Sequence, residues 1–417
     1  MKSKWERLER ILPYLVLLAA YLLSVGIFAV MGSENLDSDM SSEMVLANLL
    51  NEEGKLLSEN WYYSTELRVA TAVPVYRLGL MLFDSWHMAR TFAVAVLLAA
   101  MVAAYLYLMH SAGFGGAMAY CAAGLILPVS VYSKFLLVYG HFYSVHFILI
   151  CLLLAIMIRL VQGRFNRVLG PLLLLGLSVW GGMGGVRMLM LCAAPLGLTV
   201  CVLLFARLCS SGTLREAVRA REAAYLLWTA LVCVGFLTGY LVNAAVFASK
   251  YSFENFGEAL LYQVNWEELF RQINYLPYYF GFVNRQPLIS LDGVCNAAAI
   301  AVVIVSVLSL FSLLRRQREL SGGQRLVVLF TAFSVALGIG LNSMMRYAQV
   351  GGGAYTVSYY LPGLLLLVSM AFAAVDRKEI RLKGFRTVIL LAMTSVFLLQ
   401  TVRYVRSDFR MGDADYR

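Results

Sequence analysis

Charge is scarce in this sequence. Only 14% of the 417 residues are charged and 61% are hydrophobic, whereas soluble domains have about 25% charged and about 45–50% apolar residues. This composition excludes a water-soluble enzyme, a coiled coil and a disordered protein. Proline is also rare, with 8 residues. Apolar runs of ~17–25 residues recur along the chain, and each run is long enough to cross a bilayer as a helix. We therefore expect an all-α polytopic membrane protein.

Several common sequence motifs are missing as well. The seven cysteines form no CxxC pair and lie in or beside apolar runs, which is typical of small apolar residues rather than of disulfides or metal ligands. The sequence contains no P-loop, nucleotide-binding fingerprint, HExxH or zinc-ligand spacing. The first apolar run, 11–31, has the length of a full span and is followed by no small-residue cleavage site, so we do not expect a signal peptide.

The apolar runs predict about eleven transmembrane helices in a single transmembrane domain, 1–417. The predicted spans are 11–31, 88–109, 115–132, 141–160, 168–183, 188–206, 223–247, 293–314, 326–343, 355–375 and 387–403. An odd number of crossings places the two termini on opposite sides of the membrane. The run at 168–183 is short and interrupted by glycine.

The distribution of charge predicts the orientation. The loops on the N-terminal side carry 20 Lys and Arg against seven acids, a net charge of +13, and the other side carries −3. Since cytoplasmic loops are enriched in Lys and Arg, the N-terminus is expected to be cytoplasmic, in the plasma (inner) membrane. Every basic cluster borders a predicted span, where it suits anionic headgroups, so the basic excess does not indicate a nucleic-acid partner.

Two long loops are predicted on the outer side, at 32–87 and 248–292. Polar loops add little to the packing of a bundle, so two on one face suggest that chemistry or recognition occurs there. Loop 248–292 is rich in aromatic residues, which suits contact with a sugar or a lipid tail. An aromatic belt at headgroup level is the alternative.

The first outer loop carries a concentration of acids directly after the first span: Asp37, Asp39 and Glu43. Apolar residues between 40 and 50 recur with a helical period and predict a short amphipathic helix along the membrane surface, and 77–83 predicts a second one. Asp is a preferred N-cap residue, so capping is an alternative role for Asp37 or Asp39. One cap accounts for only one of the two carboxylates.

This arrangement resembles the GT-C superfamily of integral-membrane glycosyltransferases, which includes bacterial protein O-mannosyltransferases and aminoarabinose transferases. The first outer loop in that superfamily often reads Asp-(Asp/Glu)-x-x-x-x-Glu, followed some way on by an Asn-Trp pair. The corresponding residues here are the run Asp37-Ser38-Asp39-Met40-Ser41-Ser42-Glu43 and the pair Asn60-Trp61. Ser38 departs from the pattern, and Asp39 supplies the second acid one position later.

The resemblance implies an enzyme that moves a sugar from a polyprenyl-phosphate-linked donor to a glycan, lipid or protein acceptor at the outer face, with inversion. It implies a catalytic carboxylate that acts as a general base: Asp37 by position, Asp39 as the second candidate, with Glu43 to orient either. Trp61, Tyr62, Glu66 and Tyr347 are assigned to substrate-facing loops. Relatives often end in a soluble domain, which we expect to be absent or truncated, since about fourteen residues follow the last predicted span.

A lipid phosphate requires cations near membrane level on the outer side. Arg187 follows a glycine-rich stretch and Arg346 precedes another, and for both the alternative is an interfacial arginine that extends toward the headgroups. His141 is a third candidate, with a satisfied interfacial histidine as its alternative. Weaker candidates for binding the phosphate, for each of which a solvated loop charge is favoured, are Arg68, Lys134, Lys250, Arg271 and Arg285. No metal site is assigned. Two alternatives stay open for the cofactor: the protein uses none, or the Asp-x-Asp pair holds a divalent cation.

Two other functions remain open. A transporter or flippase of lipid-linked sugars predicts charged residues at mid-span and internal repeats, and neither is clear in the sequence. A polymerase or ligase of surface glycans is the third hypothesis, and its key loop is expected in the second half of the chain.

Overall fold

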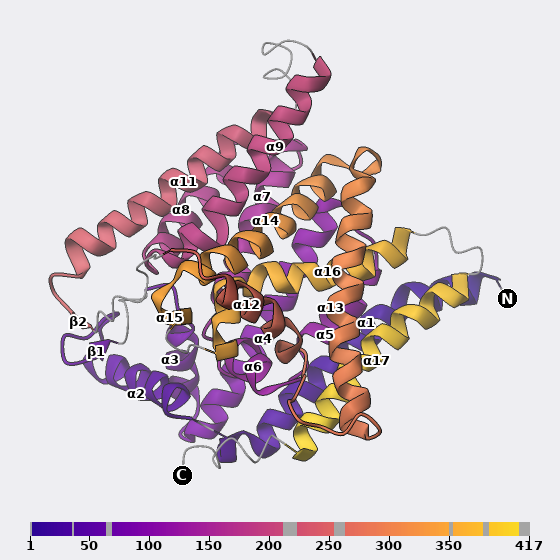
Figure 1. Cartoon of the computed structure of the whole chain (residues 1–417). Coiled ribbons are helices and arrows are strands. Elements are labelled where there is room, and N and C mark those ends of the chain that lie inside the picture. The colour runs from indigo at the N-terminus through magenta and orange to yellow at the C-terminus, as the bar shows by residue number, and fades with distance from the viewer. Residues whose placement is uncertain are drawn as a thin grey trace.

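The computed structural model is a bundle of helices that differ widely in length and inclination (Figure 1). The structure describes residues 2–35, 37–63, 69–211, 223–253, 263–349, 353–377 and 383–407. Among these residues, eight helical segments are long and apolar enough to cross a membrane. They are α1 (Lys2–Met31), α4 (Trp86–Ala112), α7 (Ser144–Val161), η3 with α9 (Leu189–Ala193 and Ala194–Ser211), α11 with η5 (Ala224–Val242 and Asn243–Phe247), α13 (Leu291–Arg315), α14 (Gly322–Met344) and α17 (Lys383–Ser407). The protein is therefore an all-α, multi-pass membrane protein.

The predicted count of eleven spans is not confirmed. The predicted span 355–375 is the 3-10 helix η7 (Gly353–Tyr359) joined to α16 (Leu361–Arg377) with a bend of 81°, which makes a ninth span when the pair is counted as one. The predicted span 168–183 is α8 (Leu169–Gly182), which has 14 residues. A helix of that length extends about 21 Å, short of a bilayer core of about 30 Å.

The predicted span 115–132 is not one continuous helix. It begins as α5 (Ala117–Leu125), and α6 (Val131–Ser133) and the π-helical turn η2 (Lys134–Val138) follow after a break. Pro128 disfavours helical conformation at the residue before it, and Ser130 starts a new helix through a capping box with Ser133. Hydropathy alone does not detect these two signals, because the residues around them are apolar.

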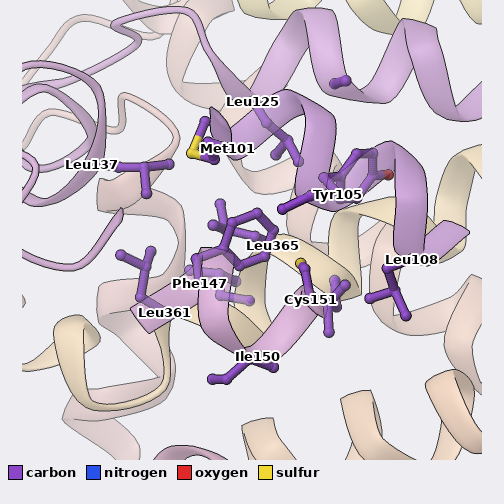
Figure 2. Packing of buried hydrophobic residues seen from close by; sticks show 14 of the residues in the cluster. Met101, Tyr105, Leu108, Leu125, Leu137, Phe147, Ile150, Cys151, Leu361 and Leu365 are labelled. Atoms are coloured by element: carbon purple, nitrogen blue, oxygen red, sulfur yellow. The ribbon is translucent and has the colours of Figure 1, made fainter. Parts of the chain in front are cut away.

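The core lies around α7 and α16, which are buried on nearly all sides. Every residue of α16 from Leu361 to Ala373 is buried. Figure 2 shows Phe147 and Ile150 of α7 among side chains of α4, α5 and α16, including Met101, Leu125 and Leu365. The surrounding helices bury one side and expose large apolar residues on the other, as expected for helices that face lipid.

The small residues of α5 allow other helices to approach it closely. This helix packs against α1, α16 and α17, and a Cβ at Gly124 would stand 2.8 Å from the Phe397 ring. The beginning of the break that follows α5 is thereby held inside the bundle, where Ser24 of α1 donates a hydrogen bond to the Ile126 carbonyl at 2.8 Å.

The two long segments predicted to be outer loops each contain short elements. The first contains η1 (Gly32–Asn35), α2 (Ser38–Glu53), β1 (Tyr62–Tyr63) and α3 (Val73–Leu82), and the second contains β2 (Ser252–Phe253) and α12 (Trp266–Tyr279). The remaining elements are η6 (Gln317–Glu319) and α15 (Arg346–Gln349). Helices at 40–50 and 77–83 were predicted, and α2 and α3 confirm them.

The two segments meet each other. β1 and β2 pair in parallel, with Tyr62 opposite Ser252 and Tyr63 opposite Phe253, and the rings of Tyr63 and Tyr251 lie 6.0 Å apart. In Figure 1 this pair lies beside α2 and α3 at one corner of the bundle. Contact between the two segments agrees with the prediction that both lie on the same side of the membrane.

Candidate active site

Asp37 is the N-cap residue of α2. Its backbone is extended, and its Oδ1 accepts a hydrogen bond of 2.8 Å from the Met40 amide. The capping interpretation is thus confirmed for Asp37. The N-terminal end of a helix also stabilises negative charge through its dipole. One carboxylate oxygen of Asp37 is used by the cap. The side chain is only half-buried, so the carboxylate is still partly accessible to solvent or substrate.

Electrostatic neighbours act on Asp37 in opposite directions. Burial raises the pKa of this carboxyl, and the neighbouring Asp39 carboxylate raises it further. The Met40 amide and the Lys134 ammonium lower the pKa of Asp37. Lys134 is the first residue of η2 and is only 6% exposed. The structure therefore contradicts the interpretation of Lys134 as a solvated loop charge and places it near the predicted base.

The other two acids of the motif lie in different surroundings. Asp39 is exposed in the first turn of α2. Glu43 is partly buried and faces α3, where it lies within hydrogen-bonding reach of the Tyr76 hydroxyl. Asp39 thus acts on Asp37 by charge, whereas Glu43 takes part in the contact between α2 and α3.

A buried arginine that the sequence analysis did not single out fixes the position of α2. Arg90 of α4 is 1% exposed, and its guanidinium donates hydrogen bonds of 2.9 Å to the carbonyls of Met40 and Tyr139. It also lies over the Tyr76 ring, 4.3 Å from the centroid. Since Met40 is in the first turn of α2 and Tyr139 follows η2, Arg90 ties the helix that carries Asp37 to the turn that carries Lys134.

Replacement of Arg90 by Met is expected to lower the stability of the folded protein by about 3 kcal/mol, because two or more charge-assisted hydrogen bonds of about 1.5 kcal/mol or more each are lost and buried carbonyls are left unpaired. The measurement is a thermal melt of the purified protein in detergent. Arg318→Met is the control, since Arg318 is exposed in η6. Equal melting temperatures of the two variants would contradict the role assigned to Arg90.

His141 lies in the tight turn between η2 and α7. It is 1% exposed and has a positive φ of 58°, which is uncommon for a residue other than glycine. The turn is compact because Gly140 packs so closely on the Phe135 carbonyl that a Cβ would overlap it. Burial and the Arg90 charge lower the pKa of His141 well below its ordinary value, so we expect a neutral imidazole here.

Arg187 lies between two tyrosine rings. It is 8% exposed, and its guanidinium carbon is 4.7 Å from the Tyr143 centroid and 4.4 Å from the Tyr359 centroid. The Tyr143 hydroxyl is 3.2 Å from that of Tyr355, which shares η7 with Tyr359. Stacking on aromatic faces holds a guanidinium in one plane, which favours the two-pronged contacts that Arg makes with phosphate.

The segment 134–143 links Arg187 to Asp37. Lys134 at its start acts on Asp37, and Tyr143 at its end stacks on Arg187. Phe135, next to Lys134, contacts the ring of Tyr355 at 5.8 Å. One segment of ten residues therefore interacts through its first residue with a carboxylate whose pKa is raised and through its last residue with a stacked arginine.

The remaining predicted phosphate ligands do not join this cluster where the structure describes them. Arg346 is exposed at the start of α15 and makes no hydrogen bond or ion pair with another described residue. Arg68, Glu66 and the side chain of Tyr347 lie outside the described residues. Of the other basic residues, Arg271 forms ion pairs with Glu267 and Glu268, at 2.6 Å and 2.9 Å, in α12.

Trp61 and Tyr62 lie near the C-terminal end of α2, away from Asp37. Asn60 donates a hydrogen bond of 2.8 Å to the Glu53 carboxylate at the last residue of that helix. Sixteen residues of α-helix extend about 24 Å. In the structure Asn60 thus stabilises the end of α2, while Tyr62 is exposed on β1.

Four residues at the site were missed or set aside at the level of sequence: Arg90, Lys134, Tyr143 and Tyr359. A usable signal existed for Arg90, because an ionisable residue inside an apolar run is costly and marks function or a specific partner. For Lys134 the signal was the break at Pro128, which folds this charge back into the bundle. No sequence pattern pairs Tyr143 with Tyr359, since they are more than 200 residues apart.

The donor set of the described residues does not form a metal centre. No three His, Cys, Asp or Glu side chains among them are grouped so that they could hold a metal ion. The Asp-x-Asp pair therefore offers two carboxylates at most in the part of the chain that the structure describes, one of which already accepts from Met40.

Fold and site together define a polytopic α-helical membrane protein with an ionisable cluster at one end of the bundle. A scan against protein-family models finds no match for the chain. A search of curated proteins finds no significant match either.

Proposed function

We propose that this protein is a GT-C-type glycosyltransferase that moves a sugar from a polyprenyl-phosphate-linked donor to an acceptor hydroxyl, with Asp37 as the general base. The observation that carries the proposal is the half-buried Asp37 carboxylate, whose pKa is raised by burial, connected through the segment 134–143 to the stacked Arg187. A carboxylate base and a phosphate-binding cation suit the attack of a hydroxyl on a carbon from which a phosphate leaves.

The reaction has three linked changes. Asp37 takes the proton of the acceptor hydroxyl as the hydroxyl oxygen forms a bond to the anomeric carbon of the donor sugar. The bond between that carbon and the phosphate oxygen breaks, and its electron pair remains on the phosphate. Attack from the side opposite the leaving group inverts the anomeric configuration. The product is a glycoside, and polyprenyl phosphate is released.

Two cations are assigned roles in this reaction, one at the phosphate and one at the base. Arg187, stacked between two tyrosines, binds the phosphate through its fork of N–H donors. Lys134 acts on Asp37 in the free protein, and it keeps the base ionised until the acceptor binds. Asp39 is the second candidate for the base. It is exposed, so its carboxylate is solvated by water to a greater extent than that of Asp37.

The proposed location follows the charge distribution. The basic loops lie in the cytoplasm, the segments with α2 and α12 face outward, and the membrane is the plasma (inner) membrane. A donor with a polyprenyl tail then approaches within the bilayer, so the site needs no nucleotide-binding motif.

The proposal is tested with the full chain in lipid nanodiscs and a panel of polyprenyl-phospho-sugars, together with an extract of envelope lipids and glycans. Mass spectrometry measures the release of polyprenyl phosphate and the mass added to the acceptor. We expect one donor to give both products in equal amounts. Failure of every donor on the panel to release polyprenyl phosphate would contradict the proposal.

The pH dependence of transfer is expected to report on Asp37. A carboxylate acts as a base only when ionised, so kcat/KM falls as the pH drops through the pKa of Asp37. Burial raises this pKa above about 3.9, the ordinary value for Asp. Asp39→Asn removes a charge that raises the pKa, so the acidic limb moves to lower pH. Lys134→Gln removes a charge that lowers the pKa, so the limb moves to higher pH.

The measurement is kcat/KM against pH for the wild type and the two variants. Opposite shifts are the diagnostic result, because a general loss of folding would move both profiles in the same way. An acidic limb that stays in place in both variants would remove Asp37 from the role of base.

A further inference from the structure

The helix α12 presents three different faces. Its residues point in directions that repeat every 3.6 positions, and the exposure of its side chains divides the helix into a buried face, an exposed apolar face and an exposed polar face. In Figure 1 α12 lies at the front of the bundle. Such a division is informative because a helix in water needs only two faces.

The buried face is polar at its centre. Glu268 and Gln272 are 1% and 0% exposed, and the Gln272 side chain donates to Glu268 at 2.7 Å. The oxygen of the Gln272 side-chain amide accepts a hydrogen bond from Thr356 of η7 at 3.0 Å, and the backbone carbonyl of Gln272 accepts one from Tyr360 at 3.2 Å. These hydrogen bonds fix the rotation of α12 about its axis and join it to η7.

The exposed apolar face consists of Trp266, Phe270 and Ile273, which recur at the i, i+4 and i+7 positions of a single helical stripe. Their exposed fractions are 68%, 64% and 46%. In water the opposite arrangement is expected, with the charged Glu268 outside and the large apolar residues Trp266 and Phe270 inside. The stripe is therefore expected to face an apolar medium rather than water.

The exposed polar face begins about 100° around the helix from this stripe. It carries the exposed residues Glu267 and Asn274 and the partly exposed residues Arg271 and Tyr278, and Arg271 pairs with Glu267 at 2.6 Å. A helix with an apolar stripe and a charged face side by side, both exposed, is typical of a helix that lies in the interface of a membrane.

The helix α12 is connected to two candidate membrane spans, α14 and α13. The Asn265 amide donates to the Ser343 carbonyl at the end of the candidate span α14. After α12 the chain passes through Leu288 and Ile289, which are 89% and 101% exposed, directly into the candidate span α13. The helix that carries the apolar stripe is therefore joined to two candidate membrane spans, by a hydrogen bond at its start and by the chain after its end.

We infer that α12 is an interfacial helix whose apolar stripe binds the acyl chains of the leaflet on the side of Asp37, with its polar face in the headgroups. The lipid then anchors the helix on which η7 rests, and η7 carries Tyr359, one of the two tyrosines that flank Arg187. This inference does not depend on glycosyl transfer, since it concerns the contact between this helix and ordinary lipid.

Spin labels on the full chain test the inference. Cys201, Cys209 and Cys233 are first replaced by alanine, which leaves only buried native cysteines in the described structure. Single labels are attached through Phe270→Cys and Ile273→Cys in the stripe, and through Glu267→Cys and Asn274→Cys on the polar face. Leu308→Cys, exposed on α13, and Arg318→Cys calibrate lipid and water.

The protein is placed in nanodiscs of phosphatidylglycerol and phosphatidylethanolamine without polyprenyl lipid, and collision of each label with oxygen and with a water-soluble nickel complex is measured. We expect a severalfold higher ratio of oxygen to nickel collisions at 270 and 273 than at 267 and 274, close to the Leu308 value. Equal access of nickel to all four labels overturns the inference. So does loss of both collisions at 270 and 273, or a contrast that appears only after polyprenyl phosphate is added.

Discussion

The Asp37→Asn variant is expected to lose glycosyl transfer by about 10²–10⁴-fold, the usual contribution of a general base, and to keep its fold. Asn ranks with Asp as an N-cap residue, so the hydrogen bond from the Met40 amide to this side chain is preserved. What the variant removes is the ability to accept the proton of the acceptor. Initial rates of transfer and the thermal melting temperature, measured on the same preparation, separate the two effects.

Asp39→Asn is the matched control for this variant, because it removes the same charge two residues away from an exposed position. We expect it to retain most of the activity at neutral pH. Full activity of Asp37→Asn would exclude Asp37 as the base, and a loss confined to Asp39→Asn would transfer the role to Asp39.

Replacement of Arg187 by Ala is expected to raise the KM for the lipid-linked donor by about 10- to 100-fold, in line with the loss of charge-assisted hydrogen bonds of about 1.5–3 kcal/mol. The KM for the acceptor is expected to change little. Arg187→Lys keeps the charge but loses the planar fork and its stacking on Tyr143 and Tyr359, so we expect only partial recovery.

The control for Arg187 is Arg318→Ala, which removes an exposed charge in η6. Initial rates at varied donor concentration give the two KM values. An equal effect of Arg187→Ala and Arg318→Ala on donor use would remove the phosphate role of Arg187.

The sequence predicts the helix at the first outer loop well, because its determinants are local. Asp37 before a run with a helical period predicts an N-cap, and both the cap and the helix are found. The long spans are equally predictable, since length and hydropathy decide them. The half-helix α5 is not, because the break depends on Pro128 and on the Ser130 capping box within an apolar stretch.

The candidate site is less predictable, because it depends on contacts between distant parts of the chain. Arg187 is picked out by its glycine-rich context, but its stacking on Tyr143 and Tyr359 joins three separate segments. In the sequence Lys134 resembles a solvated loop charge, but in the structure it lies in η2 and is buried. Arg346 has a similar glycine-rich context and remains exposed, so local pattern alone does not distinguish the two arginines.

The most direct test of the account measures transfer and translocation of the same lipid-linked sugar in one preparation. The full chain is reconstituted in vesicles that hold the donor in both leaflets, with acceptor on one side. We predict that wild-type protein releases polyprenyl phosphate and glycosylated acceptor in equal amounts, and that Asp37→Asn releases neither. Movement of intact donor between leaflets without release of polyprenyl phosphate, unchanged in Asp37→Asn, would contradict the account and indicate a flippase.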